Sequence, residues 1–172
     1  GVVDSAGLRA PALPALVAAA SDPDPHVRIN ALRLLPGYRT PDLSTPALVG
    51  RLADPDANVA MAAAQSLADL PDPAAAAALR SLAADGTAPA GLRGAALASA
   101  MRMDPNATAP LAAMWVDSSA WLLRLHASRA LGSAGWRLAA APLQRLARDR
   151  HYLVSADALN AIRASADTTA GE

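Results

Sequence analysis

The residues best suited to catalysis or metal binding are three histidines, His26, His126 and His151. None has a second histidine three or four residues away, the spacing that a metal site on one helix needs. The chain has no Cys, and all 15 of its basic residues are Arg, which excludes thiolate and Schiff-base chemistry and Cys-ligated metals. No Gly-rich phosphate loop and no nucleophilic serine motif occurs. We therefore predict no enzymatic activity, cofactor or metal within these residues.

Charge and hydropathy narrow the choice of partners. The 172 residues carry 15 basic and 15 acidic side chains, so the formal net charge is +0. Nucleic-acid binders and proteins of anionic membranes need a cationic excess, so we expect neither kind of partner. No uncharged Leu/Ile/Val-rich run is long enough to predict a membrane span. With 53% hydrophobic residues, the chain can build a packed core.

The same pattern recurs about every 32 residues along the chain. An Asp follows an apolar run five times, with spacings of 31 or 32 residues, and a Leu stands six residues before each. The five Asp residues are Asp22, Asp54, Asp85, Asp117 and Asp149, and the Leu residues are Leu16, Leu48, Leu79, Leu111 and Leu143. A second apolar run follows each Asp and opens with Val27, Val59, Leu92, Leu123 and Val154, each with an Ala four residues on. Three independent markers with one period indicate an internal repeat.

Each copy reads as two helices joined by a turn. The first is an Ala/Leu run, such as the one predicted over residues 46–54, and the second is typified by residues 26–35. In that second helix Val27, Ala31, Leu34 and Leu35 have the spacing of one helical face, which we expect to be buried. Most Pro residues fall at predicted joints, and Pro142 is expected to kink or delay its helix. In the turns, Asp24 and Asp56 are placed to cap the next helix.

The turn segments 22–31 and 54–63 resemble those of the HEAT-repeat family, in particular its short bacterial, bilin-lyase-like members. The family places an Asp in the turn and an Arg six residues later, as Asp22 and Arg28 do. Arg93 and Arg124 match after slightly longer turns, whereas Ala60 and Ser155 replace the Arg. The resemblance therefore does not imply a continuous Asp–Arg ladder between repeats.

The resemblance covers roughly residues 8–165 and implies an all-α fold. It implies a right-handed α-solenoid of about five two-helix repeats, with the second helices on the concave side. Stacking of neighbouring copies is also required physically, because one pair of helices cannot bury enough apolar surface alone. We expect one domain over residues 1–172, with repeats at about 8–38, 39–70, 71–103, 104–134 and 135–166. Residues 1–7 are expected to end an earlier repeat of a longer chain, a disordered leader being the alternative.

Two rows of residues on the second helices are expected to point away from the core. The third-position row, three residues after each apolar opening, is Asn30, Ala62, Ala95, His126 and Asp157. The sixth-position row is Arg33, Gln65, Ala98, Arg129 and Asn160. Arg124, His126 and Arg129 are expected to form a cationic cluster beside them. These polar residues are the candidate binding site, and a solvated helix face is the alternative.

The tryptophans also give expectations. Trp115 is expected in the core, and Trp136 half-buried in a turn between repeats. Trp121 is either a staple packed on the preceding turn or an exposed binding anchor. His26 and His151, each just before a second helix, are expected to be solvated.

These features favour a protein-interaction scaffold that binds a protein or peptide on its concave face. The alternative is an auxiliary substrate-positioning region of a larger bacterial peptidase, isomerase or lyase, which HEAT-like arrays accompany. A HEAT-like DNA glycosylase is a third reading, built on Trp115, Asp117, Trp121 and Arg124. The charge balance and the absence of Lys disfavour it.

Overall fold

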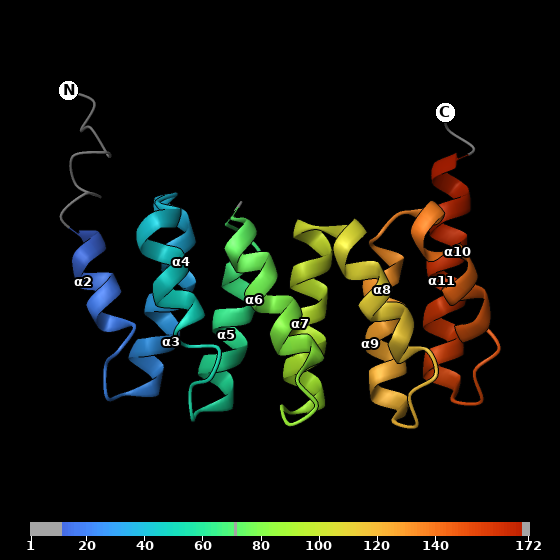
Figure 1. The fold of residues 1–172 in the computed structure, drawn as a ribbon, viewed down its shortest axis with the longest axis horizontal. Coiled ribbons are helices and arrows are strands. Elements are labelled where there is room, and N and C mark those ends of the chain that lie inside the picture. Colours follow the sequence, from blue (N-terminus) through green and yellow to red (C-terminus); the bar gives the residue numbers. More distant parts are fainter. Residues whose placement is uncertain (1–11, 71, 170–172) are drawn as a thin grey trace. The chain divides into compact units, whose positions relative to one another are not determined.

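The computed structural model describes residues 12–70 and 72–169, with side chains as far as residue 165. Residues 1–7, expected to end an earlier repeat, lie outside this range. Ten α-helices and one 3₁₀ helix, and no strand, occur in the described part of the chain (Figure 1). The elements are α2 (Ala12–Ala19), α3 (Pro25–Leu34), η1 (Leu35–Tyr38), α4 (Pro41–Val49), α5 (Ala57–Leu67), α6 (Pro73–Ala84), α7 (Ala90–Met103), α8 (Pro105–Trp115), α9 (Trp121–Gly132), α10 (Trp136–Leu146) and α11 (Tyr152–Thr169).

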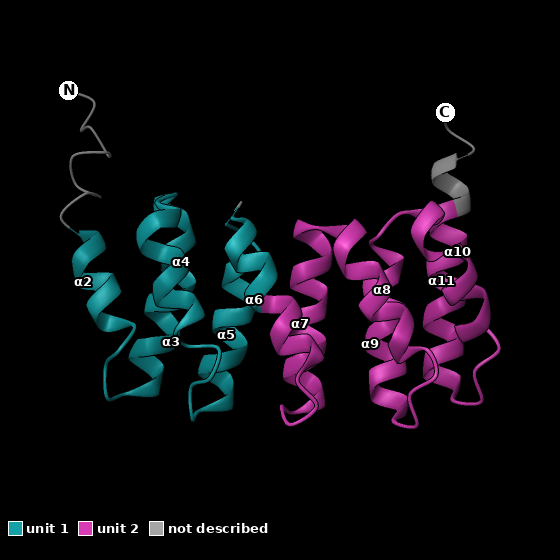
Figure 2. Cartoon of the chain, in the orientation of Figure 1, with its two compact units in different colours: residues 1–78 teal, residues 79–172 magenta. Residues whose placement is uncertain are grey.

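The chain divides into two compact units, residues 1–78 and 79–172 (Figure 2). In the first unit, α3 packs against both α2 and α5, and α4 packs against α5. In the second, α9 lies between α7 and α11, while α8 and α10 pack against it from the layer of first helices. Each unit is therefore a double layer in which the second helices contact one another.

The Ala marker of the second helices is the most regular part of the core. Ala31, Ala63, Ala96, Ala127 and Ala158 are all buried. A small side chain at this position lets neighbouring helices approach closely, and Ala also favours the helix itself. The Leu marker of the first helices is less regular. Leu48, Leu79 and Leu143 are fully buried, whereas Leu16 and Leu111 are only partly so.

The predicted buried face of α3 is wrong by about one residue. Val27 is 37% exposed and Leu34 is 56% exposed. The buried residues are instead Arg28, Ala31, Leu32 and Leu35. The helix is rotated because Arg28 reaches carbonyl groups of its own turn and a carboxylate of the next repeat, which brings its side of the helix inward.

Two helices begin earlier than predicted. Helix α4 runs from Pro41 to Val49 and contains Pro46, which was expected to start it. Pro41 fits the first helical position, where the missing N–H is not needed, and Asp42 favours the positive end of the helix dipole. Helix α10 starts at Trp136 and contains Pro142, so Pro142 does not delay that helix.

Candidate functional site

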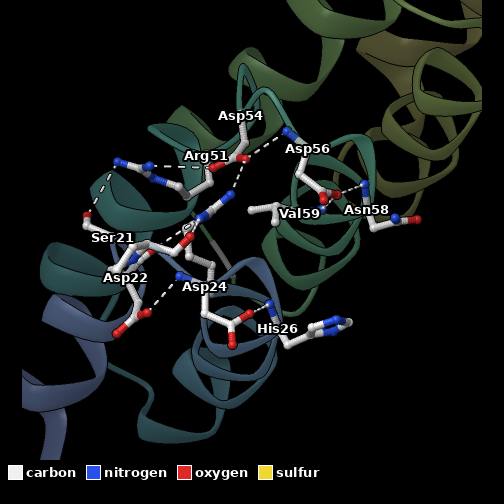
Figure 3. Close-up of polar contacts among 11 residues, drawn as sticks. Ser21, Asp22, Asp24, His26, Arg51, Asp54, Asp56, Asn58 and Val59 are labelled. Atoms are coloured by element: carbon white, nitrogen blue, oxygen red, sulfur yellow. Dashed lines mark hydrogen bonds and ion pairs between the residues drawn. The ribbon is translucent and has the colours of Figure 1, made fainter.

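The turns of the first two repeats are held by an Arg that joins one repeat to the next. The Arg28 guanidinium donates to the carbonyls of Asp22 and Pro23 at 2.8 and 3.1 Å, and to Asp54 Oδ1 at 2.9 Å. Asp54 lies in the following turn, where its Oδ1 also accepts from the Asp56 N–H at 3.0 Å (Figure 3). Asp24 and Asp56 cap α3 and α5, as predicted, by accepting from the N–H groups of His26 and Asn58.

The same arrangement recurs in the second unit around Arg124. Its guanidinium donates to the carbonyls of Ser118 and Ser119 at 2.7 and 3.2 Å. It also forms a bidentate ion pair with Asp149, in which Nε donates to Oδ2 at 2.6 Å and Nη2 donates to Oδ1 at 3.0 Å. Both side chains are buried, with 7% and 9% exposure. The prediction that Arg124 adds positive charge to the binding surface is therefore wrong, because Arg124 is a structural link between two repeats.

The third Arg that matches the family pattern is used differently. The Arg93 guanidinium lies 5.0 Å from the centre of the Trp115 ring, and its Nε donates to the Ala83 carbonyl at 2.9 Å. Trp115 is buried, as predicted. Asp117, in the turn after Trp115, instead pairs with Arg145, and both of those side chains are largely exposed.

The two buried Asp residues of these links are held in the ionised form. Burial alone would raise the pKa of Asp54, but the Asp56 N–H and the Arg28 and Arg51 guanidinium groups hold that pKa below its usual value. Hydrogen bonds from Arg124 hold the pKa of Asp149 low despite its burial. Both carboxylates therefore stay ionised at neutral pH, where each can accept from the Arg of the preceding repeat.

The sixth-position row is exposed throughout the described repeats. Arg33, Gln65, Ala98, Arg129 and Asn160 all lie at the surface. The third-position row is less uniform: Asn30 is exposed and Ala62 is buried, whereas Ala95, His126 and Asp157 are intermediate. In the second unit, Ala98, Arg129 and Asn160 stand on α7, α9 and α11, three second helices that pack in sequence. They form one exposed row across that unit.

The charged residue of this row in the second unit, Arg129, is already paired. Arg129 Nε donates to Asp157 Oδ1 at 3.4 Å, and the Ser128 hydroxyl donates to Asp157 Oδ2 at 2.7 Å. With Arg124 buried and Arg129 paired, the predicted cationic cluster is not a free positive patch. It is a polar rim fixed by hydrogen bonds between α9 and α11.

His126 packs into the neighbouring repeat instead of lying open on the row. Its ring occupies the place where a side chain of Gly94, on α7, would begin: a Cβ built there lies 2.3 Å from His126 Cγ. The His126 Nε2 is buried without a hydrogen-bond partner. Burial, and secondarily the charge of Arg129, lowers the pKa of His126. A glycine in the middle of a helix is the sequence signal for such a close approach.

This burial predicts a stability change between neutral and mildly acidic pH. The unfolded chain binds a proton at His126 near pH 6.5, whereas the folded chain binds it only at lower pH. The free energy of unfolding should therefore fall as pH drops through 6.5 towards the folded pKa. Urea unfolding at pH 7.5 and pH 5.5 measures this fall. The His126→Ala variant should lose this part of the pH dependence, whereas His26→Ala, at an exposed position, should keep it.

An aromatic stack joins the last two second helices at their N-terminal ends. The rings of Trp121 and His151 are parallel with centres 4.2 Å apart, and His151 also stacks on Tyr152 at 5.6 Å. Trp121 is 40% exposed and Tyr152 is 73% exposed. The prediction that His151 is solvated is wrong, because its ring is held between two others and its Nδ1 is buried. Trp136 is 36% exposed. It is the first residue of α10, so the prediction that it is half-buried in a turn between repeats is wrong.

Comparison with known proteins decides the family. A family model described as HEAT repeats matches residues 13–102, which is more than half of the chain. The chain belongs to the HEAT-repeat family. Together with its pairs of packed helices, this membership makes the fold an all-α solenoid of HEAT type. No curated protein sequence matches this HEAT-repeat chain significantly.

Solved structures show the same fold at low sequence identity. One is a chain from the complex of CpcE and CpcF of phycocyanin lyase from Nostoc sp. PCC7120, with 21% identity and a TM-score of 0.68. The match covers 88% of this HEAT-repeat chain and 98% of that one. Another is an engineered protein with 20% identity and a TM-score of 0.53, covering 91% of this chain and 80% of that chain. At such identities the likeness establishes the fold alone.

Among the side chains that the structure describes, no three or more His, Asp or Glu are grouped so as to hold a metal ion. None of the described helices combines the length and the apolar character needed to cross a membrane.

Proposed function

We propose that this HEAT-repeat chain is a non-catalytic scaffold that binds a protein or peptide along the sixth-position row of its second helices. The observation that carries the proposal is the exposure of this row on successive second helices within each unit. In the second unit, Ala98, Arg129 and Asn160 succeed one another on α7, α9 and α11. The row corresponds to the concave side that the HEAT resemblance implies.

The chemistry of the row suits a peptide ligand. Ala98 leaves space for a partner's side chain, while the Arg129–Asp157 pair and Asn160 offer donors and acceptors beside it. Because Ser128 and Arg129 both hold Asp157, these polar groups are fixed before a partner arrives, which lowers the entropy cost of binding. Binding of an extended or helical segment in such a surface is a common mode of peptide recognition.

A further observation supports binding over catalysis. His126 and His151, the histidines best placed for chemistry in the second unit, are engaged in packing against Gly94 and Trp121. In this proposal the described residues orient a protein partner and do not take part in bond making or breaking.

A steric block of the row tests the proposal. A protein partner is first captured with the whole chain, identified and purified. Its affinity is then measured for three proteins: the unaltered chain, Ala98→Trp and Ala141→Trp. Ala98 is on the row, whereas Ala141 is an exposed residue of the first helix α10, so the two variants add the same bulk to different faces. Ala98→Trp should weaken binding at least about tenfold, equivalent to about 1.4 kcal/mol, and Ala141→Trp should not. Equal affinities for all three proteins would exclude the row as the binding surface.

A further inference from the structure

A second surface, separate from the sixth-position row, lies at the N-terminal ends of α9 and α11. It consists of the ring stack of Trp121, His151 and Tyr152 together with Arg148 and Arg150, and is called the aromatic ledge below. The outer rings of the stack are open to solvent, Trp121 by 40% and Tyr152 by 73%. The His151 ring between them keeps Trp121 parallel to it, so the exposed rings are held in place.

The ledge carries unbalanced positive charge although the chain as a whole is neutral. Arg148 and Arg150 are exposed in the turn before α11, and neither forms an ion pair with any described residue. The one carboxylate in that turn, Asp149, is occupied by the buried Arg124. In the first two repeats the corresponding cap positions are the acidic Asp24 and Asp56, but here the position is His151. The ledge therefore has two free guanidinium groups and no free carboxylate of its own.

These features together select one kind of partner. Trp, Tyr and Arg are the residues that most often dominate the binding energy of protein interfaces. Guanidinium groups bind carboxylates through paired, charge-assisted hydrogen bonds. A polynucleotide would require a wide positive field, whereas the net charge of this chain is +0. A short acidic protein segment matches both the size and the sign of the ledge.

We propose that the aromatic ledge binds an acidic segment of a partner protein, with carboxylates on Arg148 and Arg150 and an apolar or aromatic side chain against Trp121 and Tyr152. This inference deepens the proposed protein-binding function by adding a second contact surface and the charge of the partner that it takes. The ledge and the sixth-position row are formed by different residues, so each can be disabled without altering the other.

The test uses the whole chain and a defined probe. The probe is a short fluorescent peptide rich in Asp and Glu with two Phe residues, and its control replaces Asp and Glu by Asn and Gln. Anisotropy titrations should show binding of the acidic peptide with a dissociation constant below about 1 mM and much weaker binding of the control. The variants Arg150→Glu and Tyr152→Ala should each weaken binding at least about tenfold. Both positions are exposed, and circular dichroism verifies that the variants fold.

Matched controls separate the ledge from general charge effects and from the row. Arg137→Glu changes the net charge as much as Arg150→Glu does, but at an exposed residue of the first helix α10, and it should leave the affinity within about twofold. Ala98→Trp, which blocks the row, should also leave it unchanged. Equal weakening by Arg137→Glu and Arg150→Glu, no binding of the acidic peptide, or tighter binding of a single-stranded oligonucleotide would each overturn the proposal. If Ala98→Trp does not weaken binding of the protein partner, the proposal for the row fails, but the peptide titrations still test the ledge.

Discussion

Replacement of Arg124 by Ala is expected to lower the free energy of unfolding by about 3–5 kcal/mol. The substitution leaves the Asp149 carboxylate buried without its cation and removes the donor to the carbonyls of Ser118 and Ser119. An uncompensated buried charge costs far more than the loss of an exposed ion pair. Urea unfolding followed by Trp fluorescence measures the effect, because all three Trp residues lie in the same unit as the substitution.

Arg145→Ala is the matched control for this experiment. Arg145 also pairs with an Asp of another repeat, Asp117, but the two side chains are 62% and 67% exposed. Exposed pairs contribute about 0–1 kcal/mol, so this variant should be close to the unaltered chain in stability. Similar losses for the two variants would show that burial of the Arg124–Asp149 pair has no particular role.

Gly94→Ala is expected to destabilise the protein by about 1–3 kcal/mol, although Ala is the better helix former. In an open helix position the substitution would gain up to about 1 kcal/mol. At Gly94 the new methyl group would lie 2.3 Å from the Cγ of His126, so the imidazole must leave its site. Because Cγ is close to the backbone of α9, a simple rotation of the ring tip does not relieve the overlap. Urea unfolding measures the net change.

The sign of this effect should reverse when the imidazole is removed. In a His126→Ala background, Gly94→Ala meets no ring and should stabilise α7 by up to about 1 kcal/mol. Gly91→Ala provides a second control in the same helix, because nothing lies within 4 Å of its added Cβ. Destabilisation by Gly94→Ala in both backgrounds would show that its cause is not the contact with His126.

The regular parts of the fold could be predicted from sequence because they depend on short-range patterns. The spacing of the Asp, Leu and Ala markers predicts pairs of helices, and the buried Ala column, from Ala31 to Ala158, confirms the register of the second helices. Helix capping by Asp24 and Asp56 was predicted because a cap involves neighbouring residues only. The rotation of α3 was not predicted, because a hydrophobic pattern does not show that Arg28 is turned inward.

The contacts of the candidate surfaces depend on pairs of residues from different repeats. Arg124 meets Asp149 across 25 residues of sequence, and this pairing changes a predicted surface cation into a buried link. His126 finds its space only because Gly94 lacks a side chain. The stacking of Trp121 on His151 likewise requires the register between α9 and α11. Periodicity assigns each residue a position in its own repeat, but it does not specify how that residue meets the next copy.

The double role of Arg28 and Arg124 has a consequence for the order in which the chain assembles during synthesis. Each guanidinium binds carbonyls five and six residues before it, so it can be positioned as soon as its own hairpin has formed. Its Asp acceptor lies 26 or 25 residues further along and leaves the ribosome later. A finished hairpin thus presents a fixed cation to the hairpin that follows. Growth from the N-terminus towards the C-terminus is therefore the direction in which these two joints form most readily.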